Sequence, residues 1–444
     1  MEKFVELPEL CGRCPWYELS RYKEHKFRTL GDLDESYDFI VVGAGFGGVS
    51  TAFRLMENSP GSTVLLVEAN AIGTGSSGRN AGFVSIAQIA RAIVGKQEFT
   101  LDDQKMLLRL NKIAVDKILK IKSDNKLEFE WRQDGMYKAV REIGNQKKLE
   151  LLSKYFDDLG VEYETVSSED LSQRLGTDFY KKALYLNETY LNNPSEAIRG
   201  LATALPENVF VLENSPVLKV NGGSVPNITL SSGKTIKAKK IIMTISAFLK
   251  HFYQEKAGNV TAIHSFGALT RELTDRELEN FRDVQPWGIT GTHPSSATLR
   301  YTPTKRIFVR TDIAYAKNLN INPKRMYKAL GLIKGAYDKR FVNLRHVEFE
   351  YIYGGLVSFT GNAQPFFGEV DQNVYAGVTS DGSGVTRASI LGIYLADLVT
   401  GVESEELNYI KNNYRPNYLP PDPLRTIGAV GGIVLNNLVA GEEL

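Results

Sequence analysis

The stretch that decides the fold runs from Tyr37 to Glu68 and begins YDFIVVGAGFGGVSTAFRLM. Residues 39–42 are apolar and largely β-branched, which predicts a strand buried on both faces. A helix is expected over 49–57, and after the turn at 59–61 the run TVLLVE predicts a second buried strand that ends at Glu68. The order strand, glycine turn, helix and strand is typical of a parallel α/β unit.

Three glycines in this stretch, Gly43, Gly45 and Gly48, fit the pattern G-x-G-x-x-G. The first permits a tight turn, the second lets a pyrophosphate approach the backbone, and the third lets helix and strand pack closely. Phosphate charge would then lie at a helix N-terminus. Glu68 follows Gly48 by 20 positions, where a carboxylate is expected to bind a ribose hydroxyl. The unit predicts a dinucleotide site rather than an empty glycine turn, and by itself it does not separate NAD from FAD.

The composition is that of an ordinary globular protein. The 444 residues are 43% apolar and 24% charged, enough for two domains with a sizeable core. The net charge of +1 gives no global field that would attract nucleic acid or an anionic membrane. The first residues lack the apolar core of a secretion signal. The apolar run 427–439 is shorter than the roughly 18 to 20 residues that span a bilayer. We therefore expect a cytoplasmic protein with no nucleic-acid partner and no transmembrane segment; the oligomeric state stays open.

Cys11 and Cys14 are the two cysteines, and they lie in an arm, residues 1–35, that aromatic side chains such as Trp16 are expected to hold against the surface. A zinc site would need two further ligands, and the five histidines show no paired spacing. The sequence therefore predicts no metal site.

The segment after Glu68, AIGTGSSGRNAGFVS, is rich in Gly, Ser and Asn, which predicts a loop. The glycine turn, the acid at 68 and the run Gly75–Gly82 together resemble the D-amino-acid oxidase-like family of FAD-dependent oxidoreductases. Within that family they look most similar to the γ-glutamylputrescine oxidase and glycine oxidase relatives. The resemblance implies that this loop wraps the ribityl and pyrophosphate part of FAD. Some relatives attach FAD through a cysteine in the C-terminal half, where this chain has none, so we expect non-covalent FAD.

A second glycine turn is expected near the C-terminus. The segment 373–401 predicts a strand that ends in Ser-Asp-Gly-Ser-Gly and an apolar helix that Gly401 closes. In the resembled family this turn directs amides and a helix dipole at the flavin pyrimidine, and Ser383 stands where relatives often have His. The resemblance also implies contacts by Val217 with adenine and by Ser246 near the phosphates. The expected cofactor-binding residues are Gly43, Gly45, Phe46, Gly47, Gly48, Glu68, Ala69, Ser76, Ser77, Gly78, Arg79, Asn80, Ala81, Gly82, Val217, Ser246, Asp381, Gly382, Ser383, Gly384 and Val385.

The predicted fold class is α/β (α+β overall), a Rossmann-like FAD-binding domain with an inserted sheet-plus-helix substrate domain. Helices are expected over 101–121, 142–159 and 192–205, with a short one starting at 168 and two more opening near 274 and 323. Strands are expected over 129–140, 209–220, 240–244, 260–269, 299–302, 306–311 and 347–353. The predicted parts are an arm (1–35), an FAD-binding domain (36–85, 181–255 and 354–428), a substrate domain (86–180 and 256–353) and a tail (429–444).

The resemblance implies FAD-dependent oxidation of a primary or secondary amine, or an amino acid, by hydride transfer to flavin N5, which gives an imine that hydrolyses. Such a pocket needs aromatic walls and a few polar anchors. The candidate catalytic residues are His264, Arg300, Tyr301 and Tyr353, with Phe359 and Gln364 near the flavin edge. Each has a structural alternative: Arg300, for example, could clamp a carboxylate or form a salt bridge.

Several alternatives stay open. The electron acceptor is either oxygen or a quinone. Two other readings of the whole chain are a non-catalytic FAD-containing assembly or partner protein, which the departure at Ser383 favours, and an NAD-dependent dehydrogenase.

Overall fold

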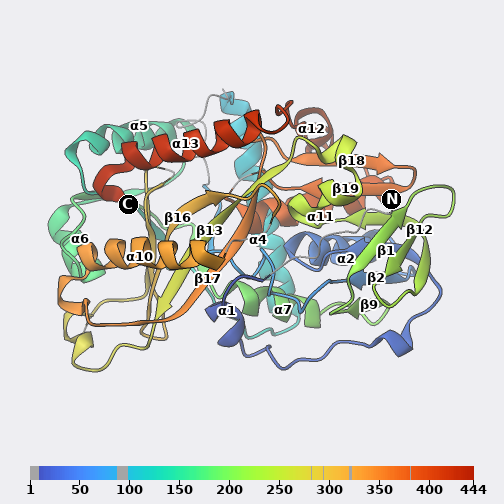
Figure 1. Ribbon diagram of the computed structural model, residues 1–444, viewed down its shortest axis with the longest axis horizontal. Helices are drawn as coiled ribbons and strands as arrows, with labels where there is room; N and C mark the ends of the chain where they lie inside the picture. Colours follow the sequence, from blue (N-terminus) through green and yellow to red (C-terminus); the bar gives the residue numbers. More distant parts are fainter. Residues whose placement is uncertain (1–9, 88–98, 282, 294, 320–322, 381) are drawn as a thin grey trace.

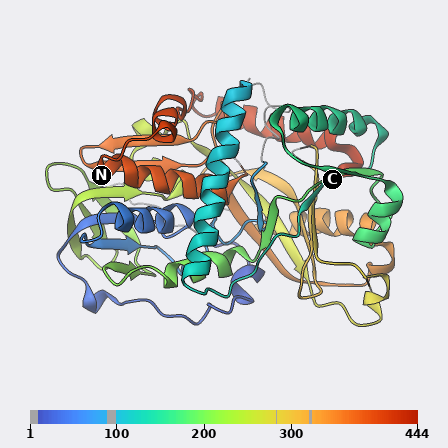
Figure 2. The ribbon, with the colours of Figure 1, turned by 180° about the vertical axis from the view of Figure 1, so that it is seen from behind.

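The computed structural model describes residues 10–87, 99–281, 283–293, 295–319, 323–380 and 382–444. Two large sheets lie side by side along the long axis of the molecule, with the first on the right and the second on the left in Figure 1. Helix α4 (Leu101–Asp124) stands between the two halves when the molecule is seen from behind (Figure 2).

The first sheet is a parallel core with an antiparallel extension. Its order is β10 (Val217–Asn221), β11 (Asn227–Leu230), β12 (Thr235–Met243), β1 (Ser36–Val42), β2 (Val64–Val67) and β9 (Val209–Leu212), and the hairpin of β18 (Phe366–Asp371) and β19 (Val374–Val378) joins through β19 to β12. Strands β19, β12, β1, β2 and β9 run parallel. Every residue of β2 is buried, as the unbroken apolar run predicts for a strand covered on both faces.

Two helices pack closely on this sheet, α2 (Phe46–Asn58) and α11 (Gly384–Thr400). A Cβ at Gly392 of α11 would overlap the carbonyl oxygen of Gly47. The hydroxyl of Thr51 donates to the carbonyl oxygens of Gly47 and Gly392 at 2.9 and 3.1 Å. This contact holds the middle of α11 against the N-terminal half of α2.

The second sheet has the order β17 (Phe349–Phe359), β13 (Thr261–Thr270), β16 (Ile307–Tyr315), β15 (Thr298–Tyr301), β14 (Trp287–Gly291), β5 (Met136–Val140), β7 (Lys182–Leu186) and β6 (Glu164–Val166). Helices α10 (Pro323–Arg340) and α6 (Ser168–Leu175) cover one face, over an apolar core that includes Phe266, Tyr301 and Tyr337. The other face meets the first half of the molecule. A three-stranded sheet, β3 (Phe83–Ser85), β8 (Thr189–Asn192) and β4 (Trp131–Arg132), lies at this junction.

The remaining helices are α1 (Pro15–Glu18), α5 (Ile143–Leu159), α7 (Pro194–Thr203), α8 (Leu249–Phe252), α9 (Gln254–Ala257), α12 (Glu405–Asn413) and α13 (Leu424–Ala440), with 3-10 turns at Leu30–Asp32, Ser246–Phe248, Glu277–Phe281, Val342–Leu344 and Gly441–Glu443.

The predicted fold class is confirmed, and three local predictions need correction. The run 129–140 is two strands because Gly135 breaks it at φ +71°, where the Tyr185 ring leaves no room for a side chain. The helix expected from Thr274 is a 3-10 turn. Strand β7, which we assigned to the FAD-binding segment 181–255, pairs instead with β5 and β6 of the second sheet. The domain boundaries themselves stay predictions.

By length and composition one helix among the described residues could cross a membrane, and the expectation of no transmembrane segment stays a prediction. Within the described residues, one helix, Leu424–Glu443, is 20 residues long with a mean hydropathy of 1.3, and 6% of its apolar window is buried. This helix is longer than the apolar run 427–439 at both ends. It begins at Leu424, the first residue of α13, and the 3-10 turn after α13 continues it to Glu443.

Candidate functional site

The first glycine turn lies where the parallel strands of the first sheet end. Gly43 follows β1 with φ +96°, and a Cβ there would stand 2.9 Å from the carbonyl oxygen of Thr244, the residue that follows β12. A Cβ at Gly48 would overlap the carbonyl oxygen of Gly43. Both positions therefore require glycine, and the turn opens at the carboxyl edge of the sheet, where ligands of such sheets bind.

Glu68 and Ala69 follow β2 at the same edge. The Glu68 carboxylate accepts hydrogen bonds from the backbone N–H of Ala44 at 2.9 Å and of Asn70 at 3.2 Å. Burial raises the pKa of Glu68. The acid thus lies beside the glycine turn, as its spacing predicts for a ribose ligand.

The loop that contains Ser76 and Ser77 folds onto the first turn of α2. The hydroxyl of Ser77 accepts a hydrogen bond from the backbone N–H of Phe46 at 3.1 Å. Asn80 braces the loop: its amide nitrogen donates to the Ser77 carbonyl at 2.7 Å, and its amide oxygen accepts from the N–H of Gly82 at 2.8 Å. A Cβ at Gly78 would overlap the carbonyl oxygen of Gly73. The structure therefore brings together two glycine-rich segments about 30 residues apart in the chain.

Arg79 points away from this turn. Its guanidinium donates to the carbonyl oxygens of Thr74 and Cys11, both at 2.6 Å, of Gly12 at 3.0 Å and of Gly354 at 3.1 Å. The side chain thereby fastens the N-terminal arm and β17 to the loop.

The second glycine turn opens α11. Ideal Cβ atoms at Gly382 and Gly384 would meet no atom within 4 Å, so the backbone is accessible there. Val385 is buried in one core with Phe46, and an ideal Cβ at Gly47 would stand 3.3 Å from the carbonyl oxygen of Ala388, which places the first two turns of α11 against the start of α2. Ser383 is the N-cap of α11, and Asp381 lies outside the described residues.

Val217 and Ser246 flank this region. Val217 is buried at the start of β10, where its side chain joins the core beneath the sheet. Ser246 has φ +56°, and its hydroxyl hydrogen-bonds to that of Ser358 on β17. The ligand contacts expected of both residues stay predictions.

The residues at this edge fit FAD. The N-termini of α2 and α11 suit phosphate oxygens and a flavin ring edge, with accessible glycine backbone at the start of α11, and Glu68 suits a ribose.

The four candidate catalytic residues divide between the two faces of the second sheet. Arg300 and Tyr353 lie on the face toward the first half of the molecule, since Arg300 contacts the carbonyl of Ala81 and Tyr353 contacts that of Asn80. Tyr301 lies in the core under α10, 4.9 Å from the ring of Phe281. His264 shares a strand face with Phe266, a member of that same core. This placement does not favour a substrate contact by His264 or Tyr301.

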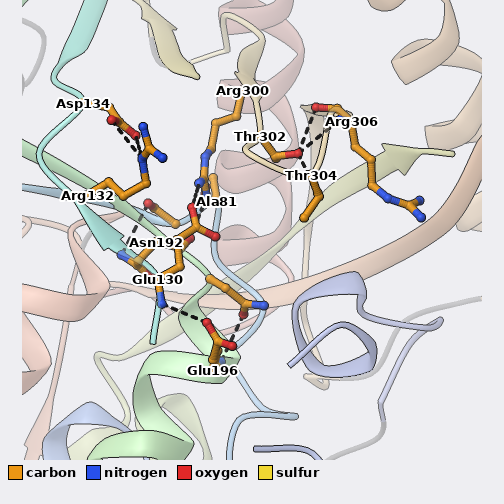
Figure 3. Close-up of polar contacts among 12 residues, drawn as sticks. Ala81, Glu130, Arg132, Asp134, Asn192, Glu196, Arg300, Thr302, Thr304 and Arg306 are labelled. Carbon is orange, nitrogen blue, oxygen red and sulfur yellow. Dashed lines mark hydrogen bonds and ion pairs between the residues drawn. The ribbon is translucent and has the colours of Figure 1, made fainter. Parts of the chain in front are cut away.

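Arg300 is fully buried, and its guanidinium contacts other groups of the protein (Figure 3). It donates to the carbonyl oxygens of Asn192 at 2.7 Å and Ala81 at 3.1 Å, and it forms an ion pair with Glu130 at 3.2 Å. Burial lowers the pKa of Arg300. These contacts favour the salt-bridge alternative over a carboxylate clamp.

Tyr353 is held by the arm. Its hydroxyl accepts a hydrogen bond from the indole N–H of Trp16 at 2.9 Å. Burial raises the pKa of Tyr353 well above its usual value, so the phenol is neutral at physiological pH. Phe359 ends β17, and Gln364 is buried in the next loop, where its carbonyl accepts from Thr360 at 2.9 Å.

Sequence reasoning missed two cations on the inward face, Arg310 and Lys138. Backbone pairing aligns a row across the sheet, and neighbouring residues in such a row point to the same side. The row is Tyr353, Gly267, Arg310, Thr298, Thr290 and Lys138. Within the part of the chain that the structure describes, no hydrogen bond or ion pair engages either cation. Arg310 falls in a predicted strand, and two-residue alternation with Phe308 was the signal that could have found it.

Both cations are half-buried. Burial lowers the pKa of Arg310 and lowers that of Lys138 to about 8. A positive charge held without a partner in a sparsely hydrated place is costly, so an anionic group would stabilise it.

The fold and the glycine turns define a flavin-binding oxidoreductase. The family described as FAD dependent oxidoreductase (DAO) matches residues 38–398, and the chain belongs to this family. It is 23% identical over 391 residues to the gamma-glutamylputrescine oxidoreductase of Escherichia coli, a match that covers 87% of this chain and 88% of that one.

Solved structures of similar fold include a glycine oxidase and an L-amino acid deaminase. Glycine oxidase from Bacillus cereus has a TM-score of 0.70 at 14% identity, over 86% of this chain and 100% of that chain. L-Amino acid deaminase from Proteus myxofaciens, in complex with anthranilate, has a TM-score of 0.68 at 13% identity, over 90% of this chain and 95% of that chain. The prediction of an FAD-dependent amine or amino-acid oxidoreductase is confirmed at this level.

Proposed function

We propose that this enzyme oxidises a primary or secondary amine that carries a carboxylate, with Arg310 as the carboxylate ligand. The observation that carries the proposal is a cation on the inward sheet face, in register with Tyr353, that no described residue pairs. A guanidinium binds a carboxylate through two parallel hydrogen bonds. Lys138, in the same row, adds positive potential.

The glycine turns and Glu68 would hold FAD, which would supply hydride-accepting chemistry for the oxidation of the C–H bond beside the substrate nitrogen to an imine that hydrolyses. The chain's own residues would bind and orient the substrate. Arg310 would hold the carboxylate, and the ring of Tyr353 would wall the pocket. A Cβ at Gly267 would stand 2.9 Å from the Phe308 ring and 3.3 Å from the Tyr353 ring, so glycine there makes room for these two rings on the sheet face that carries Arg310.

We also propose that FAD is held without a covalent bond. The thiol of Cys14 lies 3.4 Å from the Gly78 carbonyl, and burial raises its pKa to about 11, which leaves it an unreactive thiol. Acid denaturation should release yellow flavin into the supernatant. Flavin that stays with the protein pellet would contradict non-covalent binding.

Paired substrates test the role of Arg310. The wild-type enzyme should prefer an amino acid over its decarboxylated amine in kcat/KM by about 10- to 150-fold, since a hydrogen bond to a charged group is worth about 1.5–3 kcal/mol. Arg310→Met should abolish this preference, and Arg276→Met, at an exposed arginine, should keep it. An Arg310→Met enzyme that retains the preference would contradict the proposal.

A further inference from the structure

Helix α13 presents an apolar face to solvent. Its inner side packs on β16, with Ala429 and Ile433 partly covered. On the outer side Ile427, Val434 and Leu438 are 66%, 53% and 74% exposed. A soluble surface helix normally turns charged residues outward, and an exposed apolar patch of this kind marks an interaction site.

Helix α10 continues this surface with positive charge. Figure 1 shows α10 and α13 on the near side of the second sheet, and Arg340 at the end of α10 donates to the Glu443 carbonyl at 3.0 Å. The exposed residues of α10 include Lys328 and Lys339, beside Tyr327 at 81% exposure and Leu332 at 46%. Asp338 is the acid of α10, and Lys334 pairs with it.

The C-terminal end of α13 is tied into the fold. The Glu443 side chain is buried and accepts from the N–H of Arg141 at 2.8 Å, and its carbonyl also accepts from the N–H of Ala297 at 3.0 Å. A helix that crossed a bilayer would have to break these bonds and leave β16. The helix is therefore placed to lie on a membrane rather than to span it.

We propose that α13 and the outer face of α10 dock this enzyme on a membrane that carries anionic lipid. The apolar side chains of α13 enter the boundary between headgroups and acyl chains. Lys328 and Lys339 contact the anionic headgroups, and Tyr327 lies at the polar boundary. The combination of an apolar helix with a basic, acid-poor neighbour favours a lipid surface over a second copy of the chain.

Vesicle flotation tests this proposal, with the FAD-loaded full chain. Wild-type protein should float with phosphatidylcholine vesicles that contain phosphatidylglycerol, and less with phosphatidylcholine alone. Val434→Glu/Leu438→Glu should lower partitioning into vesicles at least about tenfold. Each change removes an apolar side chain whose burial in the bilayer would contribute about 1.5–3 kcal/mol. Lys328→Glu/Lys339→Glu should remove the preference for phosphatidylglycerol. The control Val225→Glu, at a residue 57% exposed beyond β10 of the first sheet, should float as wild type does.

Flavin content and melting temperature, unchanged in all variants, establish that they fold. A wild-type protein that stays in the soluble fraction with both vesicles would overturn the proposal. A lipid-free dimer that Val434→Glu/Leu438→Glu dissociates, without vesicle binding by the wild type, would assign the surface to a second copy and overturn it too. Binding that resists alkaline carbonate extraction would indicate a spanning helix and contradict surface docking.

Discussion

The hydroxyl of Ser77 accepts a hydrogen bond from the backbone N–H of Phe46 at 3.1 Å. This bond fixes the loop after β2 on the first turn of α2. The loop and the glycine turn, which form two sides of the cofactor site, are thereby held together. We expect Ser77→Ala to weaken FAD binding about fivefold, because a net hydrogen bond is worth about 1 kcal/mol. Titration of FAD into apoprotein measures this. Ser232→Ala, in the exposed hairpin after β11, is the control, and equal affinities for both variants would show that the bond does not shape the site.

Gly48→Ala should disrupt the cofactor site more severely. The new methyl group would overlap the Gly43 carbonyl, so strand and helix must separate. We expect a loss of about 1–3 kcal/mol in the free energy of unfolding together with poor FAD retention. Gly61→Ala is the matched control and should retain flavin, since a Cβ there meets no atom within 4 Å. If Gly48→Ala purified with full flavin content, the close approach of α2 to β1 would not be required for binding.

The Arg300–Glu130 pair should contribute mainly to stability. Arg300→Met leaves the Glu130 carboxylate without its ion-pair partner and two backbone carbonyls without a donor, which should cost about 3–5 kcal/mol. The double variant Arg300→Met/Glu130→Gln should recover part of the loss, as chemical denaturation would show. A stable Arg300→Met enzyme whose affinity for carboxylate substrates alone falls would reverse the assignment and make Arg300 the clamp.

Lys138 should give the unfolding free energy a distinctive pH dependence. Its pKa is lowered to about 8 in the folded protein by burial, whereas the unfolded chain keeps the usual value of about 10.4. Between these values the unfolded state binds more protons, so the contribution of Lys138 to stability rises with pH and is least favourable below about 8. Lys138→Met should therefore be more stable than wild type at pH 7, and the difference should shrink toward pH 10. The exposed Lys154→Met is the control; a constant difference across this range would contradict the burial of the ammonium group.

The sequence predicted those parts of the site that short-range geometry determines. Gly43, Gly48 and Glu68 could be recognised because a tight turn, a close approach and a fixed spacing each demand one residue type. The contact of Ser77 with Phe46 was not predicted, because the family resemblance implied only that the loop of Ser77 wraps the ribityl and pyrophosphate part of FAD. The faces of the second sheet could not be predicted, because a strand's position in the sheet decides which of two alternating sets points inward. Tyr301 and Arg300 are neighbours in the chain and therefore lie on opposite faces. Which of the two points inward depends on the position of β15 in the sheet.

Arg310 and α13 escaped prediction for different reasons. Arg310 is informative because no residue in the described part of the chain pairs with it, and pairing partners come from distant strands. The apolar run 427–439 is too short to indicate a membrane by itself. Its meaning depends on where α13 begins and on how little of it the fold covers.

We expect bound FAD to be reduced by an amine that carries a carboxylate. The most direct measurement is anaerobic mixing of the FAD-loaded enzyme with amino acids, N-methyl amino acids and simple amines, while the visible absorption of oxidised flavin is followed. We predict rapid loss of that absorption with at least one carboxylate-bearing amine, and a much slower loss with its decarboxylated counterpart. Flavin that stays oxidised with every amine and amino acid in the panel would contradict the account.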